Sequence, residues 1–110
     1  MNWKIGGPGR YRKTATVEAM QISADGLRNE NQVSQNSLSL AAISGWMRAN
    51  GFRDFEAYEV FVDDVLLYGF RLKTLEGWME AKPGCWILRG SEGEFWPVQE
   101  SIFAKTYAMV

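Results

Sequence analysis

The amino-acid sequence predicts an α+β domain in which one main helix packs on a largely antiparallel sheet of about five strands. The helix is predicted at about residues 37–50, where apolar residues recur at three- and four-residue spacing and form one face. The sheet is predicted from segments rich in β-branched and aromatic residues, separated by glycine, proline and aspartate. One helix followed mainly by strands favours a helix lying on an antiparallel sheet.

The chain has 110 residues, which is enough for one modest hydrophobic core. Residues 1–10, "MNWKIGGPGR", combine three glycines with a proline and are predicted to form an irregular N-terminal arm. We therefore expect a single domain over residues 11–110.

The first strand, with some irregularity, is predicted over residues 11–23, "YRKTATVEAMQIS", and a polar loop over residues 24–36. Asn36 or Ser37 can cap the helix that follows, and Asn50-Gly51 supplies a left-handed stop. Gly45 weakens the middle of this helix, so we expect it to admit a close backbone neighbour.

Further strands are predicted at residues 55–63, 65–77 and 78–81, with a turn at Asp63-Asp64 between the first two. Pro83-Gly84 has the residue order of a type II turn. In the tail, residues 99–104 suit one helical turn and residues 105–110 a closing strand.

Residues 83–97, "PGCWILRGSEGEFWP", predict a β-hairpin. With Ser91-Glu92 as a two-residue loop, Arg89 pairs with Glu94, so that opposite charges face each other. The same register pairs Leu88 with Phe95 and Ile87 with Trp96. It directs Trp86, Leu88, Phe95 and Pro97 toward the helix and leaves Ile87, Arg89 and Trp96 near solvent.

Several kinds of chemistry are excluded by composition. The chain has no histidine and a single cysteine, so imidazole-dependent catalysis and the usual zinc or copper sites are absent. The glycines at positions 6–9 lack the spacing of a phosphate-binding loop. We therefore expect a non-enzymatic protein with no cofactor and no metal.

The net charge and the hydropathy of the chain limit which binding partners and which cellular compartment we expect. A net charge of −1 disfavours nucleic acid as the main partner. No basic segment leads into an apolar one, and no apolar run approaches the length of a membrane-spanning helix. One cysteine cannot form an internal disulfide, so the fold needs no oxidising compartment, and we expect a soluble intracellular protein.

The hairpin face near solvent is the candidate binding surface. Trp96 beside Arg89 and Ile87 suits stacking on a planar or anionic ligand, or a hot spot for a protein partner. The basic residues that would extend this surface are Arg12, Lys13, Arg71 and Lys73.

Three blocks of the sequence, "YRKTATVEAMQIS", "TLEGWMEAKPGCWILRG" and "GEFWPVQESIFAKTYAMV", together resemble a family of small proteins of tailed bacteriophages and prophages. Members typically carry Thr-Leu-Glu-Gly, Pro-Gly-Asp-Trp-Ile and Gly-Glu-Phe-Tyr-Pro. The resemblance covers residues 11–23 and 74–107. It departs at Cys85, where the family has aspartate, and at Trp96, where the family has tyrosine.

This resemblance implies a viral origin and expression in the cytoplasm of a bacterial host, but no activity. By analogy with small phage accessory proteins, we expect a protein that binds a host target and inhibits a bacterial defence system. The target is either a host protein or a nucleotide-like signal molecule. The alternative is a minor virion or assembly protein that acts by self-association, so a homo-oligomer is left open.

Overall fold

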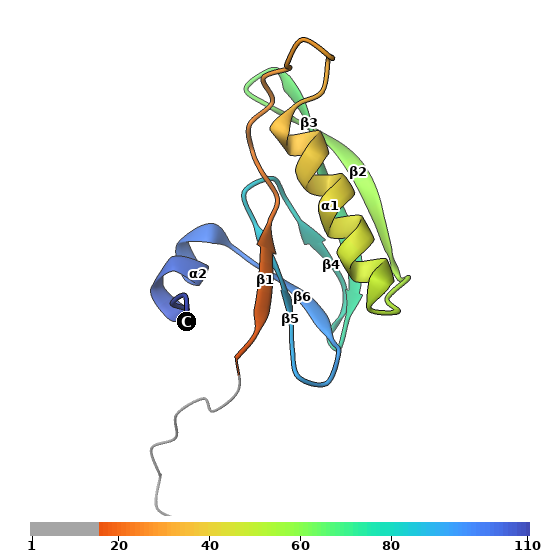
Figure 1. The fold of residues 1–110 in the computed structure, drawn as a ribbon, viewed down its shortest axis with the longest axis vertical. Coiled ribbons are helices and arrows are strands. Elements are labelled where there is room, and N and C mark those ends of the chain that lie inside the picture. The colour runs from red at the N-terminus through yellow and green to blue at the C-terminus, as the bar shows by residue number, and fades with distance from the viewer. Residues whose placement is uncertain (1–15) are drawn as a thin grey trace, which may run out of the picture.

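The computed structural model describes residues 16–110 and has the predicted α+β architecture (Figure 1). The predicted arm at residues 1–10 and the candidate residues Arg12 and Lys13 lie outside the described residues. The elements in chain order are β1 (Glu18–Gln21), α1 (Gln35–Ala49), β2 (Phe55–Val62), β3 (Val65–Thr74), β4 (Gly77–Ala81), β5 (Trp86–Arg89), β6 (Phe95–Val98) and α2 (Glu100–Thr106).

The strands form two antiparallel three-stranded sheets, ordered β1-β5-β6 and β2-β3-β4. The predicted turn between β2 and β3 is confirmed, with φ of 49° at Asp63 and 64° at Asp64, the left-handed geometry of tight hairpins. The type II turn is also confirmed: Gly84 has φ of 97°, and the Cys85 N–H donates to the Lys82 carbonyl at 3.0 Å.

Helix α1 begins two residues before its predicted start. Ser34 is the N-cap, and its side-chain oxygen accepts a hydrogen bond from the Ser37 N–H at 3.1 Å. The predicted end is confirmed, since Asn50 caps the helix and Gly51 has φ of 79°. The close neighbour expected at Gly45 is not found: apart from its chain neighbours and the backbone of α1, no described atom lies within 4 Å of the position that a Cβ would take there.

Asn36 lies in the first turn of α1 rather than capping it, and it is almost fully buried. Its side-chain amide donates to the Ser23 carbonyl at 2.7 Å and to the Tyr68 carbonyl at 3.1 Å. Its side-chain oxygen accepts from the Tyr68 N–H at 2.9 Å. One side chain therefore joins the helix to strand β3 and to the loop after β1.

A single hydrophobic cluster connects α1 to both sheets. Its buried members are Leu40, Ile43 and Met47 from the helix, Phe70 and Leu72 from β3, Ala81 from β4, Ile87 and Phe95 from the other sheet, and Ile22 just after β1. Because both sheets contribute, the helix holds their inner faces together.

Strand β5 is covered on both faces, because the consecutive residues Ile87 and Leu88 are both fully buried. Ile87 faces α1, whereas Trp86, on the other face, stacks on Phe103 of α2 with ring centroids 4.1 Å apart. Figure 1 shows the two helices on different sides of β5.

The predicted helical turn in the tail is thus confirmed as α2, but the predicted closing strand is wrong. Residues 107–110 form no strand. Tyr107 instead stacks on Phe103 with centroids 5.1 Å apart, which extends the Trp86–Phe103 stack and holds the tail against the face of the sheet.

The predicted hairpin register is wrong by one residue. Arg89 pairs with Phe95, Leu88 with Trp96 and Ile87 with Pro97. Gly93 permits this register, because it adopts φ of 82° and donates to the Gly90 carbonyl at 3.0 Å, so that the loop gains a third residue.

When the pairing of two strands shifts by one residue, every side chain of one strand moves to the other face of the sheet relative to its partner strand. Ile87 and Phe95 therefore share the core face, and Trp96 shares the opposite face with Leu88. The prediction that Ile87 lies near solvent is wrong.

Candidate functional site

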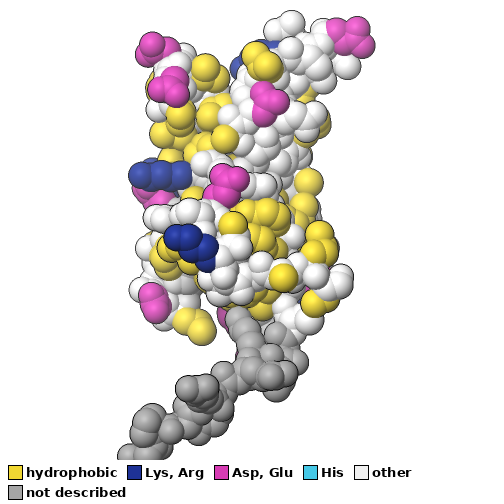
Figure 2. All heavy atoms as spheres, turned by 90° about the vertical axis from the view of Figure 1, so that its left-hand side faces the viewer, with side chains coloured by type: hydrophobic (Ala, Val, Ile, Leu, Met, Phe, Trp, Pro, Cys, Tyr) yellow, Lys and Arg dark blue, Asp and Glu magenta, His cyan; other side chains and the backbone are white. Residues whose placement is uncertain are grey.

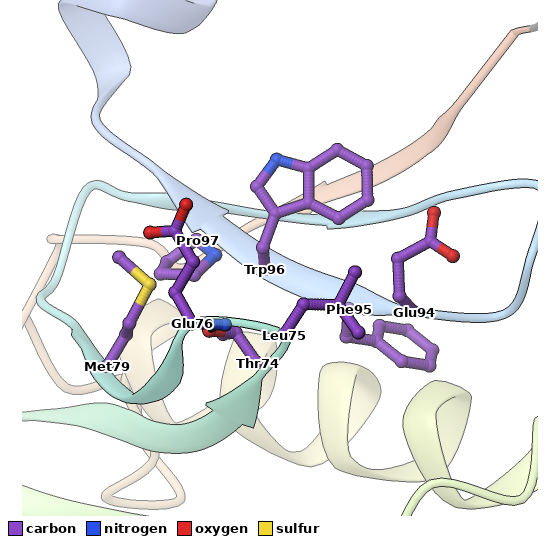
Figure 3. Close-up of a pocket in the computed structure, with 8 residues that line it drawn as sticks. All are labelled: Thr74, Leu75, Glu76, Met79, Glu94, Phe95, Trp96 and Pro97. Carbon is purple, nitrogen blue, oxygen red and sulfur yellow. Dashed lines mark hydrogen bonds between the residues drawn. The ribbon is translucent and has the colours of Figure 1, made fainter.

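A groove runs along the free edge of β6, opposite the turn that joins β3 to β4 (Figure 3). We call this cavity of about 220 Å³ the β6 groove. Its lining residues are Thr74, Leu75, Glu76, Met79, Glu94, Phe95, Trp96 and Pro97. It continues into a wider hollow of about 620 Å³ at the hairpin tip, which Lys73, Glu92 and Gly93 also line.

The β3–β4 turn forms one wall of the groove. The Thr74 hydroxyl donates to the Gly77 carbonyl at 2.8 Å and accepts from the Glu76 N–H at 3.1 Å, so one side chain holds the turn closed. This geometry leaves Leu75 90% exposed beside the groove. The wall therefore presents an aliphatic side chain and a carboxylate to an incoming ligand.

Strand β6 forms the other wall. Phe95 is fully buried and contacts the rings of Trp46 and Phe52 at centroid distances of 5.1 and 5.0 Å, which anchors the strand to the core. Pro97 has no N–H to offer at the free edge. A ligand bound here would therefore be held mainly by side chains, since Pro97 interrupts the row of backbone donors that an added strand would use.

Gly90 allows the side chains of Glu94 and Trp96 to lie across the hairpin. A Cβ at this position would collide with the Glu94 carboxylate and come within 3.0 Å of the Trp96 ring. Glu94 and Trp96 are both half-buried. Figure 3 shows them reaching from β6 on the same side as the Glu76 carboxylate, which comes from the turn.

The charge of the β6 groove is negative. Glu76 and Glu94 line it, and no lysine or arginine of residues 16–110 does. Lys73 lines only the adjoining hollow, where Glu92 also lies. The site combines an apolar floor, an indole ring and two carboxylates, a set that suits a ligand with apolar and cationic parts.

The structure does not gather the five predicted site residues that it describes into one surface. Trp96 lines the β6 groove and Lys73 the adjoining hollow, whereas Ile87 is in the core. Arg89 pairs with Glu18 at 2.9 Å. Arg71 lies on the other sheet.

Arg71 belongs to a cluster of its own on the outer face of β2-β3-β4. Its guanidinium lies 4.4 Å from the ring centroid of Tyr58 and within 3.8 Å of Glu56 and 3.5 Å of Glu80. Gly69 makes room for that ring, because a Cβ there would lie 3.0 Å from it. Burial raises the pKa of Tyr58, and Glu80 raises it further.

The groove residues from the β3–β4 turn were missed because residues 65–77 read as one long strand. The sequence does carry a signal, since Leu75 and Glu76 occupy a two-residue loop where glycine, asparagine or aspartate is usual. An aliphatic residue at the tip of a turn is more typical of an interaction surface than of a turn alone.

Cys85 lies next to the type II turn and does not line the β6 groove. Burial raises the pKa of its thiol, so the protonated form dominates near neutral pH. Among the described residues, no three Cys, Asp or Glu side chains are placed to hold a metal ion. None of the helices in this part of the chain is long and apolar enough to cross a membrane.

A second apolar hollow, of about 480 Å³, lies between β1 and the C-terminal tail and includes Val17, Trp86, Phe103 and Tyr107. Figure 2 views the molecule from this side and shows hydrophobic side chains gathered around the region of α2. Thr16 and the C-terminal residues 106–110 also contribute to its lining.

Comparisons of the chain with protein families, with curated proteins and with solved structures find no match.

Proposed function

We propose that the protein is a non-enzymatic accessory protein that binds a host protein through the β6 groove and thereby inhibits a bacterial defence system. The observation that carries the binding role is the exposed apolar surface of the groove. Leu75 is 90% exposed and Met79 is 38% exposed, and both side chains line the groove. Clustered apolar side chains of this size are typical of surfaces that a partner covers.

The resemblance of residues 11–23 and 74–107 to tailed-phage proteins supports the viral setting and the host cytoplasm as the place of action. Of the two targets expected from the sequence, the groove favours a protein. Glu76 and Glu94 would repel the phosphates of a nucleotide, and Arg71 and Arg89 are already paired with glutamates.

The test compares two exposed leucines. The groove variant Leu75→Ser and the control Leu27→Ser, at a residue 83% exposed in the loop before α1, are each expressed as tagged proteins in a defence-carrying host. We expect the wild-type and Leu27→Ser proteins to retain one host protein and to restore plating of a phage that the defence excludes. Leu75→Ser should lose both properties while keeping its melting temperature.

Restoration of plating by Leu75→Ser at the wild-type level would contradict the role of the groove. Open-ended self-association that rises with concentration and disappears in Leu75→Ser would instead support the alternative, a minor virion or assembly protein. Analytical ultracentrifugation of the same variants separates these outcomes.

A further inference from the structure

The β6 groove has the same kinds of side chain, an aromatic ring and two carboxylates, as a cluster elsewhere in the molecule that also contains an arginine. On the outer face of β2-β3-β4, Arg71 lies over the Tyr58 ring at 4.4 Å, with Glu56 and Glu80 at 3.8 and 3.5 Å. That cluster is an arginine held on an aromatic ring between two carboxylates. The β6 groove has an aromatic ring, Trp96, and two carboxylates, but no arginine of residues 16–110 lines it.

The two carboxylates of the groove have no basic partner in the described chain. Within residues 16–110 the ion pairs are made by Arg71 and Arg89, and their partners are Glu18, Glu56 and Glu80. Glu94 is moreover half-buried and lies across Gly90. The attraction between a carboxylate and an incoming cation is stronger where the carboxylate is partly desolvated than where it is fully exposed, because water screens it less.

The apolar lining fits the stem of a long basic side chain. Leu75, Met79 and Pro97 border the same hollow of about 220 Å³. An arginine can lay its methylene groups on such a surface while its planar guanidinium stacks on an indole and bonds to carboxylates. Lysine lacks the planar group and is expected to bind less well.

We infer that the β6 groove recognises an arginine side chain, flanked by apolar residues, on the protein partner. Its methylene groups lie on Leu75 and Met79, and its guanidinium stacks on Trp96 between Glu76 and Glu94. This inference rests on the proposed function, because it names the chemistry of the partner that the same groove binds.

The probe is a blocked five-residue peptide with one arginine between two leucines, titrated into isotopically labelled full-length protein and followed by NMR. We expect the Trp96 indole N–H signal to shift, with an affinity at least about tenfold above that of the peptide carrying citrulline, which keeps the shape and removes the charge. The lysine peptide should bind more weakly, and raising the salt to about 0.5 M should weaken arginine binding because added ions screen the carboxylates.

The test variant carries both Glu76→Gln and Glu94→Gln. The control is Glu59→Gln, at an exposed glutamate of β2 that does not line the groove. The double variant should lose at least about tenfold in affinity for the arginine peptide, whereas the control should bind as the wild type does. The melting temperature of each variant verifies its fold, and the citrulline comparison needs no variant.

Equal binding of the arginine and citrulline peptides would overturn the inference, as would equal binding of the lysine peptide. Self-association that the double variant abolishes would assign the groove to a second copy of the chain and also overturn it. If Leu75→Ser loses the host protein while the double variant retains it, the proposed function stands and the arginine inference fails. If Leu75→Ser retains the host protein, the proposed function fails whatever the peptides show.

Discussion

Single glycines and one proline decide where side chains can lie in this protein. Gly93 takes a left-handed conformation that lengthens the hairpin loop, and Gly90 leaves room for Glu94 and Trp96. Pro97 sits at a free strand edge, where its missing N–H breaks no ladder bond. The character of the β6 groove thus depends on residues that carry no functional group themselves.

At this scale, the cysteine yields a prediction about pH. Because burial raises the pKa of Cys85, we expect iodoacetamide to modify the folded protein at pH 7.5 more slowly than the protein unfolded in urea. The thiol is neutral in the folded state, so its contribution to stability is complete at neutral pH. This contribution to stability is lost as the pH rises from the pKa of the thiol in the unfolded chain through its higher pKa in the folded protein.

Mass spectrometry of the alkylated chain gives the rate, and Cys85→Ser should remove this part of the alkaline loss of stability. Equal rates in the folded and unfolded protein would contradict the burial of the thiol.

At the level of elements, α1 and β3 are joined by polar contacts as well as by apolar packing. Asn36 bonds to both backbone groups of Tyr68 and to the Ser23 carbonyl, in a place where water has little access. A buried backbone group without a partner costs free energy. This side chain therefore specifies how the start of the helix sits on the sheet.

We expect Asn36→Ala to lower the free energy of unfolding by about 2–4 kcal/mol, because it leaves these backbone groups without partners. Urea unfolding followed by circular dichroism measures the change. Asn31→Ala, at an exposed loop position, is the control and should change stability by less than about 0.5 kcal/mol. A loss in Asn36→Ala no larger than in the control would show that water replaces the amide.

At the scale of the whole molecule, the hydrophobic core joins the two sheets, and α2 forms an outer layer on one of them. The helix α1 joins the inner faces of both sheets, whereas α2 covers the opposite face of β1-β5-β6 through the Trp86–Phe103–Tyr107 stack. The outer layer is short and contains no buried residue of its own. It should therefore open more readily than α1 does.

We expect Phe103→Ala to detach α2 and to increase amide hydrogen exchange over residues 100–107 by at least about tenfold, with α1 unchanged. The control is Ile102→Ala, at the neighbouring residue, whose side chain is 51% exposed. The stability loss in Phe103→Ala should be about 1–3 kcal/mol, below that of a fully buried phenylalanine. Exchange that increases equally in both variants would contradict the role of the stack.

The sequence was enough to predict the α+β class, the main helix and the two tight turns, because these depend on local spacing and on residues with restricted backbone angles. Trp96, which the sequence also singled out, lines the groove, but it lies on the strand face opposite to Ile87, and its role in binding stays a prediction. These features need no knowledge of distant parts of the chain.

Only the tertiary structure decided the hairpin register, the burial of Ile87 and the partners of Arg71 and Arg89. A one-residue change in loop length alters local energy little but exchanges strand faces, so it is settled by packing against α1 and α2. The groove itself lies between two segments about twenty residues apart, the turn at Leu75 and the strand at Trp96. Periodicity within each segment carries no information about the other, so the meeting of Glu76, Glu94 and Trp96 could not be read from the sequence.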